Sequence, residues 1–76
     1  MDNGTELAIR AIIRALFQSG AINRQQVQGI MSALKEAAGG AQDNRDSETA
    51  KELAALSKHI HLDTAVPPSS DERRVP

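Results

Sequence analysis

Residues 6–18, ELAIRAIIRALFQ, form a run without glycine or proline in which the strongly polar side chains stand four apart. Side chains at this spacing share one ridge of an α-helix, so the run predicts a helix over about residues 5–18 with one narrow polar ridge. The rest of the run is aliphatic, aromatic or alanine and covers most of the circumference. We therefore expect this helix to be central and contacted from at least two sides. The polar residues are Glu6, Arg10, Arg14 and Gln18.

The next five residues, SGAIN at 19–23, predict a turn. Gly20 can adopt the left-handed conformation that ends a helix, Ile22 can pack as a hydrophobic staple, and Asn23 is a favoured N-cap. A second helix is predicted over residues 24–38, and the two helices are expected to form an antiparallel hairpin. Its apolar residues recur three and four apart: Val27, Ile30, Met31, Leu34, Ala37 and Ala38.

Gly29 and Ala33 lie four apart on this second helix. Either these small residues let another helix approach closely, or Gly29 is a tolerated and mildly destabilising residue.

The segment GGAQDNRDS at 39–47 has the composition of a loop, with the glycine pair ending the second helix and Asp46 or Ser47 capping the third. A third, shorter and weaker amphipathic helix is predicted over residues 48–60, since its stripe holds three large residues, Leu53, Leu56 and Ile60. The predicted fold is all-α, with a small helical domain at residues 1–63. Residues 64–76, rich in proline, serine and charge, are expected to form a disordered tail.

The composition indicates a thin core. Thirty residues are hydrophobic, but twelve of these are alanine, and Phe17 is the single residue among Phe, Trp and Tyr. There is no cysteine, which excludes disulfides and thiolate metal sites as a means of stabilising so short a chain. Self-association remains as a way to bury more apolar area.

We therefore expect a homodimeric helical bundle in which the first helix pairs with its copy through an isologous interface. A larger protein partner could use the same apolar surface instead. The residues predicted at the interface are Ile9, Ile12, Ile13, Leu16 and Phe17.

No apolar stretch approaches the roughly 20 residues of a membrane span. The first residues, MDNGTELAIR, also lack the basic segment and apolar run of a secretory signal. The expectation from sequence is a cytoplasmic protein without a membrane partner.

The sequence offers little for catalysis, and we expect no enzyme activity and no cofactor. The serines lie in turns, caps and the tail, and the glycine pair follows a helix, whereas a phosphate-binding loop lies between a strand and a helix. The expected function is that of a non-catalytic adaptor or accessory protein, acting by self-association and protein–protein interaction.

A DNA-binding or antitoxin-like dimer is the alternative. The second helix opens with Arg24, Gln25, Gln26 and Gln28, and Arg and Gln side chains can bond to base edges. Nine basic against ten acidic residues give a net charge of −1, which makes nucleic acid an unlikely partner because little attraction to phosphates results.

Metal binding is the third hypothesis. His59, His61 and Asp63 form an HxHxD pattern that resembles metal-binding runs of metallohydrolases. In a strand these side chains would share a face, but in a helix His59 and His61 would point about 200° apart and could not share an ion.

The stretch LFQSGAINRQQV at 16–27 is similar to the turn of SHOCT-type short hairpin domains, with Gly20, Ala21, Ile22 and Asn23 matching that turn. Val27 stands where that family more often has an aromatic residue. The resemblance implies only a small helical accessory or oligomerisation module.

Overall fold

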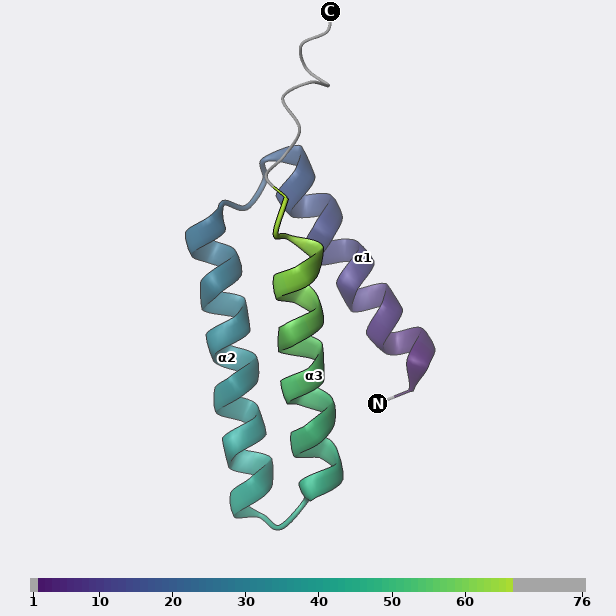
Figure 1. The fold of residues 1–76 in the computed structure, drawn as a ribbon, viewed down its shortest axis with the longest axis vertical. Coiled ribbons are helices and arrows are strands. Elements are labelled where there is room, and N and C mark those ends of the chain that lie inside the picture. Colours follow the sequence, from purple (N-terminus) through teal and green to yellow (C-terminus); the bar gives the residue numbers. More distant parts are fainter. Residues whose placement is uncertain (1, 67–76) are drawn as a thin grey trace, which may run out of the picture.

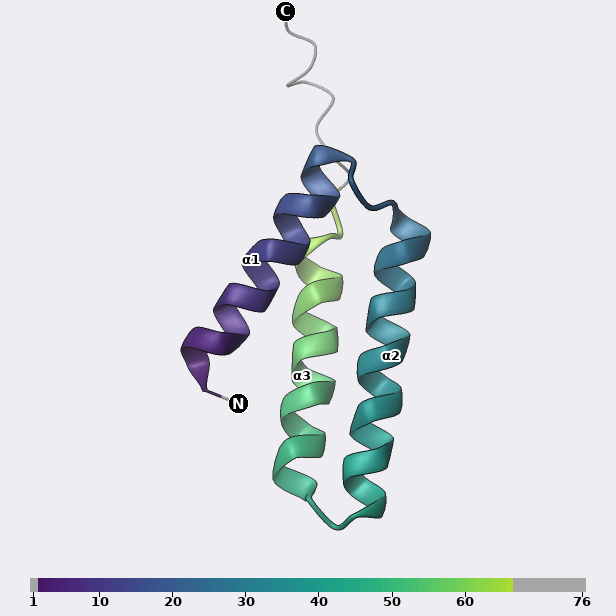
Figure 2. The same cartoon turned by 180° about the vertical axis from the view of Figure 1, so that it is seen from behind.

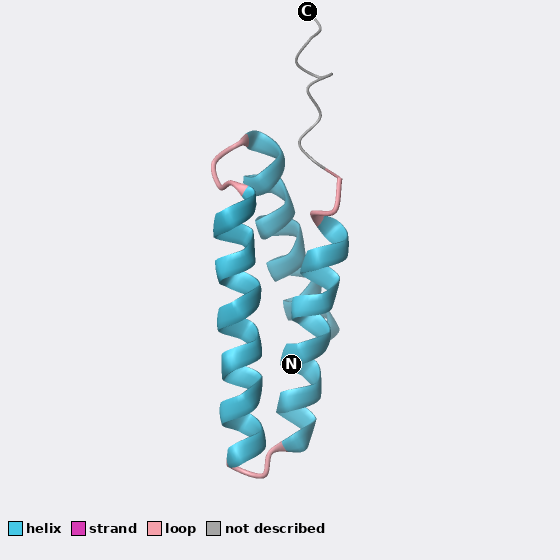
Figure 3. Cartoon of the chain, turned by 60° about the vertical axis from the view of Figure 1, so that its left-hand side comes forward, coloured by secondary structure: helices cyan, strands magenta, loops and turns pink. Residues whose placement is uncertain are grey.

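The computed structural model describes residues 2–66, which form three helices and no strand (Figures 1 and 3). Helix α1 covers Asn3–Ser19, α2 covers Arg24–Asp43 and α3 covers Ser47–Asp63. The helices run up, down and up, so that α1 and α3 are parallel and α2 is antiparallel to both (Figure 1). The all-α prediction is confirmed, and no helix within residues 2–66 has the length and hydropathy needed to cross a bilayer.

Local capping explains where each helix begins. Asp2 accepts a hydrogen bond from the Thr5 amide at 2.7 Å, so α1 starts earlier than predicted. Asn23 and Gln26 form a reciprocal capping box at the start of α2, and Asp46 accepts from the Thr49 amide at the start of α3. Each side chain satisfies an amide that has no partner within its helix.

The turn between α1 and α2 has the predicted form. Gly20 is left-handed, with φ of 84°, and Ile22 packs against the core. The amides of Ala21 and Ile22 return to the Leu16 carbonyl at 3.0 and 3.3 Å, which satisfies the end of α1.

The core lies where the three helices meet, and α2 and α3 share the most extensive contact. Phe17 of α1, Val27 of α2, and Leu56 and Ile60 of α3 form its buried cluster. Helix α3 also buries the small residues Ala50 and Ser57. The Ser57 hydroxyl donates to the Met31 carbonyl at 3.2 Å, so this buried polar group is satisfied.

The order of the helices in the packing differs from the prediction. We expected α1 to be central and to form the main hairpin with α2, yet α3 lies between the other two and α1 diverges from α2 toward its N-terminus (Figures 1 and 2). A count of large apolar residues underestimates how extensively α3 packs against its neighbours. Small buried residues contribute close packing but do not raise that count.

The second helix is also longer than predicted. It continues through Gly39 and Gly40 to Asp43, so the prediction that the glycine pair ends it at Ala38 is wrong. The turn is made by Asn44–Asp46, with Arg45 at φ of 61°. Two glycines cost about 1 kcal/mol each inside a helix, and packing of α2 along α3 offsets this cost.

The last part of the helical unit includes Thr64, which was predicted to begin the tail. Its side chain is fully buried, and its hydroxyl donates to the Ile60 carbonyl at 2.8 Å. The predicted third helix, at 48–60, also extends to Asp63. Ala65 and Val66 of the predicted tail are exposed, and its remaining residues, 67–76, lie outside the described residues.

Replacing Gly39 with alanine tests the continuous α2 helix. A Cβ at this position meets no atom within 4 Å, so Gly39→Ala should raise the free energy of unfolding by about 0.5–1 kcal/mol, measured by urea denaturation. The matched variant Gly20→Ala should lower it, because Gly20 is left-handed. A loss of stability in Gly39→Ala would mean that the helix ends at the glycine pair.

Candidate interaction surfaces

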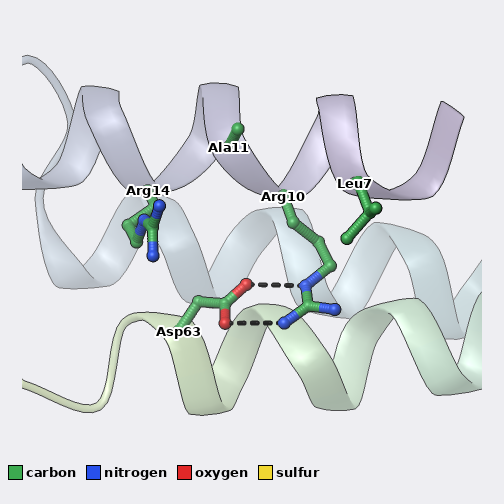
Figure 4. Close-up of a pocket in the computed structure, with 5 residues that line it drawn as sticks. All are labelled: Leu7, Arg10, Ala11, Arg14 and Asp63. Atoms are coloured by element: carbon green, nitrogen blue, oxygen red, sulfur yellow. Dashed lines mark hydrogen bonds and ion pairs between the residues drawn. The ribbon is translucent and has the colours of Figure 1, made fainter. Parts of the chain in front are cut away.

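A histidine–carboxylate hydrogen bond and an ion pair join α1 to α3, and their register follows from the parallel direction of the helices. Glu6 accepts from His59 Nδ1 at 2.7 Å when that nitrogen is protonated. One turn further along both helices, Arg10 donates to Asp63 through Nε at 2.8 Å and through Nη2 at 3.0 Å (Figure 4). Two parallel bonds between a guanidinium and a carboxylate fix orientation as well as distance.

The Arg10 contact shifts the pKa of both partners. Hydrogen bonding from Arg10 holds the pKa of Asp63 below its ordinary value of 3.8, although partial burial acts in the opposite direction. The same hydrogen bond raises the pKa of Arg10. The pair is therefore charged throughout the neutral pH range.

A shallow hollow of about 280 Å³ lies beside this pair, lined by Leu7, Arg10, Ala11, Arg14 and Asp63. In Figure 4 the Arg10 side chain crosses from α1 to Asp63, and Arg14 lies on the other side of the carboxylate. Asp63 thus occupies the position between the two guanidinium groups that an anion would take. The hollow offers no titratable pair arranged for acid–base chemistry.

The outer face of α1 borders this hollow at Leu7 and Ala11 and is apolar. We define it as two neighbouring rows of side chains spaced four apart, all exposed and none charged: Leu7, Ala8, Ala11, Ile12, Ala15 and Leu16. Ile12 is 59% exposed, whereas the Glu6 and Arg10 side chains, on the polar ridge, are 23% and 28% exposed. Glu6 and Arg10 of the polar ridge are directed at α3, which leaves a large part of the apolar surface of α1 in solvent.

The five predicted interface residues are divided by this arrangement. Ile12 and Leu16 lie exposed on the outer face of α1, while Ile9 and Ile13 are half-buried against the core. Phe17 is 2% exposed and fills the core of the single chain. Leu7, Ala8, Ala11 and Ala15 complete the surface, and sequence reasoning did not select them because they did not stand out from the rest of an apolar helix.

The HxHxD residues do not converge. The segment is helical, His59 and Asp63 bind α1, and His61 is exposed on another side of α3. Within residues 2–66 no three His, Cys, Asp or Glu side chains are placed to hold one metal ion. His59 and His61 could share a metal ion only in an extended strand, and residues 59–63 are helical.

The proposed base-reading residues also have internal contacts. The Arg24 guanidinium lies 5.0 Å from the centre of the Phe17 ring and donates to the Thr64 carbonyl at 2.7 Å. Gln26 accepts from the Asn23 amide in the capping box. Of the four residues, Gln25 and Gln28 are exposed and have no such contact within residues 2–66.

Sequence reasoning missed the ion pairs, although a signal was present. Glu6 and Arg10 are four apart, and so are His59 and Asp63, with the charges in the reverse order. Two such pairs on parallel helices can meet, but only the fold shows that α1 and α3 are neighbours.

Comparison of the chain with family models, with curated proteins and with solved structures finds no match. The SHOCT-like turn is therefore a local resemblance only.

Acid should remove the contribution of the Arg10–Asp63 pair. A carboxyl group with a depressed folded-state pKa stabilises the fold above its unfolded pKa, and this stabilisation is lost as pH falls through the folded pKa. We expect Asp63→Asn to be less stable than the wild type at neutral pH, with the difference shrinking as pH falls below 3.8 and through the lowered folded-state pKa of Asp63, because the wild-type carboxyl then becomes protonated as well. Thermal unfolding followed by circular dichroism at a series of pH values measures this difference.

The control for this prediction is a cycle with Arg10→Met. In that background Asp63→Asn should have a much smaller effect, because the hydrogen-bonded partner is gone and only the longer-range attraction of Arg14 and His59 remains. The difference between variants is the useful quantity, since the caps Asp2 and Asp46 also have lowered pKa values and respond to acid. A gap that stays constant into strong acid would contradict the assignment.

Arg24 joins the ends of all three helices through Phe17, its own helix and Thr64. Arg24→Met should lower the free energy of unfolding by about 1 kcal/mol, since one charge-assisted hydrogen bond and one exposed cation–π contact are lost. Lys51→Met removes the same charge from an exposed position and should change stability much less. If Arg24→Met and Lys51→Met lower the free energy of unfolding equally in urea, the Arg24 contacts do not stabilise the fold.

Proposed function

We propose that this protein is a small non-catalytic helical module that acts by self-association, with the outer face of α1 as its interface. The observation that supports this proposal is the exposure of Leu7, Ile12 and Leu16, at 49%, 59% and 40%, on a face without charge. Contiguous apolar surface of this kind is typical of interaction sites.

The second copy of the chain is the occupant that fits the shape of this face. Ala8, Ala11 and Ala15 are small and exposed, so the axes of two α1 helices could approach closely. In an isologous pair each copy presents the same rows of side chains, with Ile12 and Leu16 of one copy packing beside the alanines of the other. The neutrality of the face means that no like charges are brought together.

The strength of the association follows from the area available. Burial of the exposed apolar side chains of both copies favours association, whereas the loss of freedom of motion opposes it. We therefore expect a dimer that dissociates on dilution.

The alternatives have less support. Arg24 and Gln26 make contacts within the chain, so fewer side chains are available to bind DNA bases. His59 and Asp63 both contact α1, so they are not available as metal ligands on one face. A larger protein partner for the same face is the remaining possibility, and it becomes the conclusion if the chain is monomeric.

Ile12→Lys tests the proposal without disturbing the core, because Ile12 is exposed in the single chain. Its matched control is Leu62→Lys, at a residue that is 58% exposed on α3. Lysine is a good helix former, so both variants should keep their helical circular dichroism. Size-exclusion chromatography with light scattering, over a range of concentrations, should give a dimer for the wild type and Leu62→Lys and a monomer for Ile12→Lys.

A monomeric wild type at all concentrations would refute self-association. Loss of the dimer in Leu62→Lys, with Ile12→Lys unaffected, would place the interface on α3 instead. Ile13→Asp is less suitable as a test, because Ile13 packs against the core and its replacement would disturb folding as well.

A further inference from the structure

A second hollow of about 280 Å³ lies between α2 and α3, and it differs in charge from the one beside Asp63. Its lining residues are Met31 and Lys35 of α2 and Ala54, Ser57, Lys58 and His61 of α3. His61 is two positions from both His59 and Asp63, so it points about 200° away from them around the helix. The hollow is therefore on the side of α3 away from α1.

Three cationic or protonatable side chains meet at this hollow without a balancing acid. No carboxylate lines it, and neither the Arg10–Asp63 nor the Glu6–His59 contact uses any of its side chains. In the hollow beside Asp63, by contrast, a carboxylate is present and is paired with Arg10. This local excess of positive charge exists in a chain whose net charge is −1.

We propose that Lys35, Lys58 and His61 bind a phosphate group. Two lysine ammonium groups supply two positive charges, which match a phosphate dianion, and each acts as a compact point charge that can meet a tetrahedral anion from its own helix. A planar carboxylate is better recognised by the fork of an arginine, and this hollow contains none. The imidazole of His61 adds a further N–H donor.

The apolar part of the hollow extends the site beyond the anion. Met31 and Ala54 offer a surface for an organic group attached to the phosphate, so a phosphomonoester should bind at least as well as inorganic phosphate. The buried Ser57 hydroxyl is not available to the ligand, since it donates to the Met31 carbonyl. Because Lys35, Lys58 and His61 are exposed, binding should be weak and should decrease as salt is added.

Titration of the full chain with inorganic phosphate, at constant ionic strength set with sodium chloride, tests the site by ¹H–¹⁵N and histidine-ring NMR. We expect saturable shifts at Lys35, Lys58 and His61 and no comparable shifts at His59, which lies on the other side of α3. Glycerol phosphate in a second titration distinguishes the source: tighter binding indicates an organic phosphate, and equal binding indicates free phosphate.

Lys58→Gln should weaken phosphate binding about fivefold, the contribution of one unit charge close to another in water. Lys51→Gln removes the same charge from an exposed position of α3 outside the hollow and should leave the affinity nearly unchanged. Equal weakening in the two variants, shifts spread evenly over the surface, or no saturable shift would each overturn the proposal. The outcome is independent of the dimer, because the hollow and the outer face of α1 share no residue.

Discussion

Close packing of α2 against α3 is the interaction on which the rest of the structure depends. Small side chains contribute to it: Ala50 and Ser57 are buried on α3 alongside Leu56 and Ile60, and the Ser57 hydroxyl bonds to the Met31 carbonyl of α2. A chain with a single aromatic residue cannot fill a wide core, so close approach of the helices takes the place of bulk. The same packing keeps α2 helical through two glycines and brings Thr64, after the end of α3, into the folded unit.

Helix α1 depends on this pair of helices but is held differently. Phe17 anchors its C-terminal end in the core beneath the Arg24 guanidinium, and the Arg10–Asp63 ion pair and the Glu6–His59 hydrogen bond attach its N-terminal half to α3. Directing Glu6 and Arg10 at α3 leaves Ile12 and Leu16 in solvent. The surface proposed for self-association is thus a consequence of how α1 is attached to the rest of the chain.

The two candidate surfaces lie on different helices because α3 separates its charges. Asp63 and His59 face α1, whereas His61 and Lys58 line the hollow shared with α2. The HxHxD pattern is therefore divided between two environments. One half positions α1, and the other half contributes to the proposed phosphate site.

The sequence by itself determined the three helices, the capped turn at Gly20–Asn23 and the apolar character of α1, because these depend on neighbours within a few residues. The end of α2 escaped prediction, since a glycine pair ends an isolated helix but not one supported by packing. Only the tertiary structure decided that α3 is central, that Phe17 is buried while Ile12 is exposed, and that Arg10 meets Asp63. These outcomes depend on contacts between residues far apart in the chain, and no local pattern specifies which of several apolar faces is covered.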